Sequence, residues 1–64
     1  MANFYRDLTR LMSDAGFEFK RPGNGDHEIW WNPNTGKRVT VDRGINSRNT
    51  ANAILKEIGL AKGF

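Results

Sequence analysis

The sequence predicts an α+β fold in the order α-β-β-β-α, with a three-stranded antiparallel sheet that carries two helices on one face. Apolar residues recur at helical spacing near both ends of the chain. Between the ends, three segments alternate apolar and polar residues, and short stretches rich in glycine, proline and asparagine separate them. Such short connections join antiparallel strands, and a sheet this small buries one face by packing both helices against it.

The first predicted helix spans residues 4–15. Its apolar residues are spaced by three and four, which places them on one face: Phe4, Leu8, Leu11, Met12 and Ala15. Gly16 follows as the C′ residue, because glycine adopts the left-handed backbone conformation at little cost. The second predicted helix begins after Asn46 or Ser47, either of which can act as N-cap, and Gly59 ends it. Its apolar stripe contains Thr50, Ala51, Ile54, Leu55 and Ile58.

The three predicted strands span residues 17–21, 26–31 and 37–42, with turns at 22–25 and 32–36. Because side chains alternate along a strand, one set is predicted to face the helices: Phe17, Phe19, Ile29, Trp31, Val39 and Val41. The other set is predicted to face outward: Glu18, Lys20, Glu28, Trp30, Arg38 and Thr40.

Length and composition exclude several classes of protein. A chain of 64 residues has room for one domain, which we place at residues 1–64. It has no cysteine and a single histidine, His27, which excludes a disulfide scaffold, a zinc finger and a cysteine nucleophile. The acidic residues lack the spacing of a two-metal nuclease, so we expect neither metal nor cofactor. Without a long apolar run or a signal peptide, we expect a cytoplasmic protein with no membrane partner.

The positive charge is concentrated in the middle of the chain. The formal net charge is +3. The bases between residues 20 and 48 are Lys20, Arg21, Lys37, Arg38, Arg43 and Arg48. The acids in the same stretch are Asp26, Glu28 and Asp42, so this stretch accounts for the whole excess. A basic middle favours a polyanionic partner such as nucleic acid, and a charged surface that only maintains solubility is the alternative.

Four segments, in order, resemble the HicA family: GF at 16–17, GDHEIW at 25–30, GKRVTV at 36–41 and AILKEIGL at 53–60. HicA proteins are small toxins of bacterial toxin–antitoxin pairs, similar to double-stranded RNA-binding domains that have become ribonucleases. The resemblance covers roughly residues 8–60. It implies a double-stranded RNA-binding-domain-like fold, an mRNA substrate and a HicB-like antitoxin as protein partner.

Two positions depart from the pattern of the family. Family members often have Gly-Ser-His before the second strand, where this chain has Asp26 as the middle residue. Many also have proline after the third strand, where this chain has Asp42. Asp26 increases the basicity of the neighbouring His27 through its charge, weakens the contact to phosphate, or is an acid of the turn.

By this resemblance, His27 is the catalytic residue. Cleavage of RNA without a metal needs one group that removes the 2′-hydroxyl proton and one that protonates the leaving 5′-oxygen, and imidazole, with a pKa of about 6.5, suits both tasks. His27 follows a glycine-rich turn at the rim of the sheet and shares strand parity with Ile29 and Trp31. It is therefore predicted to point to the helix side, near Ser47 and Arg48. A lone structural or surface histidine is the alternative.

The residues predicted to contact RNA phosphates are Lys20, Arg21, Lys37, Arg38 and Arg48. Of these, Lys20, Lys37 or Arg38 can stabilise the charge of the phosphorane, while the second acid/base group is not identified. Gly25 lies in the loop that approaches the minor groove in double-stranded RNA-binding domains, or it belongs to a plain hairpin.

Trp30 is predicted to lie on the open face of the sheet, where it either anchors the antitoxin partner or stacks on an unpaired base. A bulge or a register shift that buries Trp30 is the alternative. Two further functions compete with the ribonuclease: a double-stranded RNA-binding module without catalysis, and a small adaptor that binds protein through Trp30.

Overall fold

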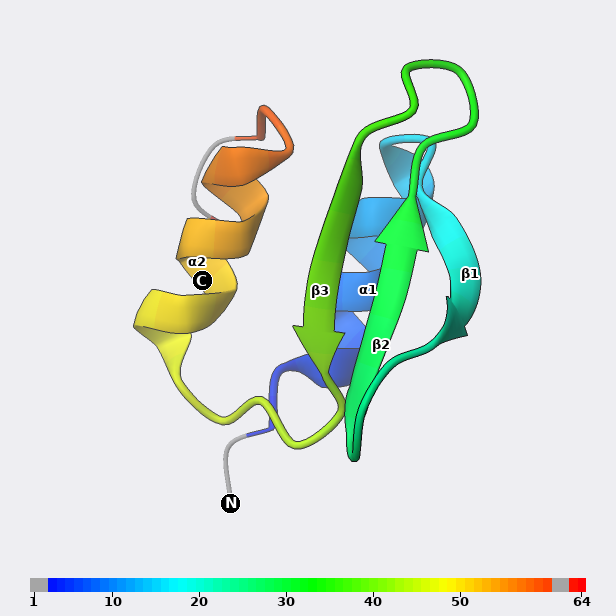
Figure 1. The fold of residues 1–64 in the computed structure, drawn as a ribbon. Coiled ribbons are helices and arrows are strands. Elements are labelled where there is room, and N and C mark those ends of the chain that lie inside the picture. The colour runs from blue at the N-terminus through cyan, green and yellow to red at the C-terminus, as the bar shows by residue number, and fades with distance from the viewer. Residues whose placement is uncertain (1–2, 61–62) are drawn as a thin grey trace.

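The computed structural model describes residues 3–60 and 63–64, and its elements follow the predicted order (Figure 1). They are α1 (Tyr5–Asp14), β1 (Glu18–Pro22), β2 (His27–Trp31), β3 (Arg38–Asp42) and α2 (Arg48–Glu57). The predicted α+β class is therefore confirmed. Neither helix in the described part of the chain is long and apolar enough to cross a membrane.

The sheet is an antiparallel meander in the order β1-β2-β3. In Figure 1, α1 lies behind the sheet and α2 lies beside β3, while the front of the sheet carries no helix. We call this front surface the open face. It is the surface on which the candidate site lies.

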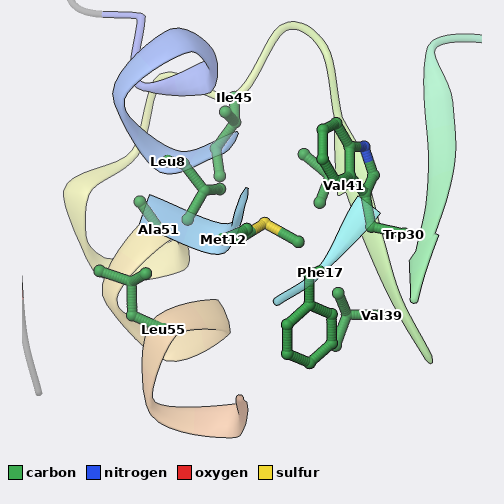
Figure 2. Close-up of a cluster of buried hydrophobic side chains, with 9 residues drawn as sticks. All are labelled: Leu8, Met12, Phe17, Trp30, Val39, Val41, Ile45, Ala51 and Leu55. Carbon is green, nitrogen blue, oxygen red and sulfur yellow. The ribbon is translucent and has the colours of Figure 1, made fainter. Parts of the chain in front are cut away.

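The core forms between the helices and the other side of the sheet (Figure 2). Its buried apolar residues are Leu8, Met12, Phe17, Trp30, Val39, Val41, Ile45, Ala51 and Leu55. The predicted helical stripes supply Leu8 and Met12 from α1 and Ala51 and Leu55 from α2, as their spacing requires. Both amphipathic helices therefore contribute to one shared core.

The ends of the helices follow local sequence signals. Gly16 and Gly59 have φ values of 94° and 88°, in the left-handed region that glycine favours, so both predicted C′ positions are confirmed. At the start of α2, the Ser47 hydroxyl accepts a hydrogen bond from the Thr50 N–H at 3.3 Å, so Ser47 rather than Asn46 is the N-cap.

For β2, the prediction of which side chains face the helices was wrong. Trp30 pairs with Val39 and Glu28 pairs with Val41, and directly opposed residues of antiparallel strands share a face. Trp30 is only 9% exposed and packs in the core (Figure 2), so Glu28 and Trp30 face the helices. The open face instead carries two partly buried apolar side chains, Ile29 and Trp31.

The side-chain orientations predicted for β1 and β3 are confirmed, and β1 contains a bulge. Phe19 pairs with Trp30 on the helix side, and their rings meet edge to face at 6.1 Å, although Phe19 is 48% exposed at the free edge of the sheet. The register shifts between Phe19 and Arg21, so that Arg21 pairs with Ile29 on the open face. Bulges of this kind place an extra residue in one strand.

Candidate functional site

The open face is built from three rows of side chains that the strand register places across the sheet. His27 and Asp42 form the first row. The second row contains Arg21, Ile29 and Thr40, and the third contains Glu18, Trp31 and Arg38. Successive rows are two residues apart along each strand, which is roughly 6 to 7 Å. The face therefore combines a histidine, an aromatic ring and two guanidinium groups within a small area.

His27 is the first residue of β2, and its side chain is exposed. A tight turn holds its backbone, because its carbonyl accepts from the Gly23 N–H at 2.9 Å and its N–H donates to the Asn24 carbonyl at 3.0 Å. The prediction that His27 points to the helix side was wrong for the same reason as for Ile29 and Trp31. Alternation along β2 places all three on the open face.

Asp26 pairs with an arginine. Its Oδ1 atom lies 3.2 Å from Nη2 of Arg43, and its carbonyl accepts from the Arg43 N–H at 3.0 Å. Both side chains are largely exposed, so the ion pair contributes less than about 1 kcal/mol to stability. Among the predicted roles of Asp26, this geometry favours an acid of the turn.

Glu28 is a largely buried acid, so the prediction that it faces outward was wrong. Its side chain is 12% exposed, and Oε1 accepts hydrogen bonds from the Tyr5 hydroxyl at 2.7 Å and from Trp30 Nε1 at 3.0 Å. Nε of Arg43 lies 4.0 Å from Oε2. Burial, and then the hydrogen bond to Glu28, raise the pKa of Tyr5 to about 12. No local sequence signal predicts this network, because it depends on which face β2 turns to α1.

Arg43 therefore contacts the residues on both sides of His27. It reaches Asp26 before the histidine and Glu28 after it. These contacts, together with the turn hydrogen bonds, hold the backbone that carries the exposed imidazole. In the sequence, Arg43 is distinguished only as one of the bases between residues 20 and 48.

Three of the predicted phosphate-binding residues lie together. Nζ of Lys20 lies 4.0 Å from the centroid of the Trp31 ring, a cation–π contact. Arg21 and Arg38 line a hollow of about 320 Å³. The other residues that line it are Ile29, Val39, Thr40 and Glu57.

The remaining predicted RNA-binding residues lie elsewhere. Lys37 is exposed in the connection between β2 and β3, and Arg48 is exposed at the start of α2. Gly25 lies in the turn before His27 with a φ of 59°, and no other atom lies within 4 Å of where a Cβ would stand. The structure therefore places none of these three within a strand of the sheet.

Trp30 does not lie on the open face, so the prediction that it anchors a protein partner there was wrong. Its indole is part of the core, and its N–H donates to Glu28. The proposed adaptor that binds through Trp30 loses its basis. The tryptophan that the register places on the open face is Trp31.

Within residues 3–60 and 63–64, no group of three or more histidine, cysteine or acidic side chains is arranged to hold a metal ion. A family model described as the HicA toxin of bacterial toxin–antitoxin systems matches residues 5–60. Comparisons with curated proteins and with solved structures give no significant match. The family match spans most of the chain and includes every helix and strand described above. The chain therefore belongs to the HicA family, the toxins of bacterial toxin–antitoxin pairs, and an antitoxin is its expected partner.

Proposed function

We propose that this toxin is a metal-independent endoribonuclease that cleaves mRNA, with His27 as its general acid/base. The observation that carries the proposal is the position of His27. It is an exposed imidazole, held by a tight turn, at the end of a sheet face that also carries Lys20, Arg21 and Arg38. Family membership supports a toxic activity, and the chemistry of the face supports RNA as its target.

The proposed reaction is an internal phosphoryl transfer. His27 removes the proton of a ribose 2′-hydroxyl, the 2′-oxygen attacks the adjacent phosphorus, and the bond from phosphorus to the 5′-oxygen breaks. The leaving 5′-oxygen takes a proton from the imidazolium of His27, directly or relayed by a water molecule, so the imidazole is neutral again at the end. The products are a 2′,3′-cyclic phosphate and a free 5′-hydroxyl. Atoms, charge and protons balance without a further reactant.

The arginines are proposed to stabilise the charge that develops on the phosphate. A guanidinium remains charged at every relevant pH and donates two parallel hydrogen bonds to phosphate oxygens. Arg21 and Arg38 line one hollow on the open face, with Arg21 in the row next to that of His27 and Arg38 in the row beyond it. Donors that are already in position where charge develops contribute strongly to catalysis.

A HicB-like antitoxin is the proposed protein partner. It would neutralise the toxin by covering His27 or the basic residues of the open face. A protein that covers an exposed histidine and several bases gains from acidic side chains at those positions.

The test uses purified wild-type protein and His27→Ala with a labelled mRNA fragment, in the presence of a chelator. We expect wild-type cleavage to persist and His27→Ala to lose at least about 100-fold in rate, because general acid/base groups contribute that much or more. Lys56→Ala, at an exposed position in the last turn of α2, is the matched control and should cleave normally. Equal cleavage by His27→Ala and wild type would refute the proposed role of His27.

The second candidate function is binding of double-stranded RNA without catalysis. The α-β-β-β-α order and the left-handed Gly25 in the turn between β1 and β2 favour it. It predicts that expressed wild type leaves bacterial mRNA intact and does not stop growth. It also predicts salt-dependent duplex binding that survives His27→Ala and weakens when Lys37 and Arg38 are neutralised.

A further inference from the structure

Trp31 is an aromatic side chain on a surface that no other element of the described chain covers. It lies on the open face between Glu18 of β1 and Arg38 of β3, and it remains partly exposed. The ammonium group of Lys20 lies over its ring at 4.0 Å. A ligand can displace this flexible surface lysine, so the face of the ring is available for binding.

The surroundings of Trp31 are cationic and polar. Arg38 stands directly opposite Trp31, and Arg21 stands one row closer to His27. Both arginines line the hollow of about 320 Å³, together with Ile29 of the central strand β2 and Thr40 of β3. Two acids border this group, Glu18 on the β1 side and Glu57 on the α2 side. The two arginines therefore flank the central strand, one on β1 and one on β3.

An aromatic ring beside guanidinium groups matches the chemistry of a nucleotide. The ring offers a stacking surface to a base, and the guanidiniums offer hydrogen bonds to the adjoining phosphates. Tryptophan and arginine are also enriched at protein interfaces, so a protein partner is the alternative that the experiment below distinguishes. On this face only Ile29 and Trp31 are apolar.

A base that stacks on Trp31 must be unpaired. In an RNA duplex the bases stack on one another and present only their edges, whereas a single strand can turn a base onto an aromatic side chain. His27 and Trp31 are at opposite ends of β2, about 13 Å apart along the strand, and both lie on the open face. A single strand laid along β2 therefore passes from the ring, across the two arginines, to the imidazole.

We propose that the open face binds single-stranded RNA, with one base stacked on Trp31 and a neighbouring phosphate held by Arg21 and Arg38. The proposal rests on the proposed ribonuclease function and names its substrate class. The base displaces Lys20 from the ring, because stacking on a base is stronger than a cation–π contact at an exposed site. The ammonium of Lys20 then turns to the RNA backbone.

The test measures binding by fluorescence anisotropy, in a His27→Ala background that prevents turnover. The probes are a short labelled single-stranded RNA and the duplex made from the same sequence. We expect tighter binding of the single strand, and a roughly 5- to 150-fold increase in its Kd on Trp31→Leu. Trp31→Phe keeps an aromatic ring and should recover most of the affinity. Thermal unfolding checks that each variant is folded.

Phe19→Leu is the matched control, because Phe19 is an exposed aromatic on the opposite side of the same sheet. It should leave the Kd unchanged. An unchanged Kd for folded Trp31→Leu, or preference for the duplex, would overturn the proposal and leave the face to a protein partner. If wild type binds the single strand through Trp31 and fails to cleave it, the proposed ribonuclease function fails and this inference stands.

Discussion

Replacing Tyr5 with phenylalanine tests the buried carboxylate network that flanks His27. Tyr5→Phe keeps the ring, which packs against the core, and removes the hydroxyl that donates to Glu28 at 2.7 Å. Hydrogen bonds to a charged group contribute about 1.5 to 3 kcal/mol. Glu28 retains the Trp30 N–H at 3.0 Å, and Tyr5 is partly exposed, so we expect a loss near the lower limit, about 1.5 to 2 kcal/mol at pH 7.

The same substitution should remove a pH dependence. Burial and the Glu28 hydrogen bond raise the pKa of Tyr5 from 10.0 to about 12, so the folded state holds the phenol proton more tightly than the unfolded state does. The resulting stability is fully present below pH 10 and is lost as the pH rises to about 12. One pKa unit corresponds to about 1.4 kcal/mol, and screening by solvent at the partly exposed ring reduces the total loss to about 2 kcal/mol.

Urea unfolding of wild type and Tyr5→Phe between pH 7 and pH 12 measures both effects. Contributions from groups that both proteins share cancel, so the difference between the unfolding free energies of the two proteins isolates Tyr5. That difference should shrink above pH 10. Because Tyr5 is the only tyrosine, phenolate absorbance reports its pKa directly. A Tyr5→Phe protein as stable as wild type at pH 7, or a difference that stays constant up to pH 12, would refute the reasoning.

Two other substitutions test the core and the cap of α2. Leu55→Ala removes a fully buried side chain from the core. It should lower the free energy of unfolding, measured with urea, by about 2 to 5 kcal/mol. A loss below about 1 kcal/mol would contradict the packing described. Ser47→Ala removes the acceptor of the Thr50 N–H and should lower the free energy of unfolding by about 1 kcal/mol, whereas Asn46→Ala should lower it little. Thermal unfolding of the two variants measures the difference. A larger loss for Asn46→Ala than for Ser47→Ala would make Asn46 the N-cap.

The order of the elements was predictable because its signals are local. The apolar stripe of α1 includes Leu8 and Met12, and Gly16 ends that helix with a positive φ, so neighbouring residues alone determine where it stops. The same holds for α2 with Ser47 at its start and Gly59 after its end. Helical spacing and glycine conformation are properties of short segments.

The face of β2 was not predictable from the strand itself. Ile29, Trp30 and Trp31 are consecutive, so apolar residues occur at both parities and alternation cannot choose between them. The choice follows from distant residues. Trp30 and Glu28 pair with Val39 and Val41, whose side chains face the core, and the Tyr5 hydroxyl donates a hydrogen bond to Glu28 on that side.

The same ambiguity affected the predicted site, because two of its residues, His27 and Trp30, lie on β2. The position of His27 after a glycine-rich turn was read correctly from the sequence, while its side of the sheet was not. The partner role given to Trp30 failed for the same reason. The contact of Arg43 with Asp26 joins residues 17 positions apart and left no pattern in the sequence.

The bulge in β1 also affects how this molecule meets other chains. β1 is a free edge of the sheet, and such edges invite pairing with strands of neighbouring molecules. Here the register breaks after Phe19, a lysine follows, and the strand ends at Pro22, which has no N–H to donate. An incoming strand therefore finds an interrupted ladder and a positive charge. Aggregation by strand pairing along the β1 edge is therefore disfavoured, and other molecules bind more readily to the faces of the sheet than to this edge.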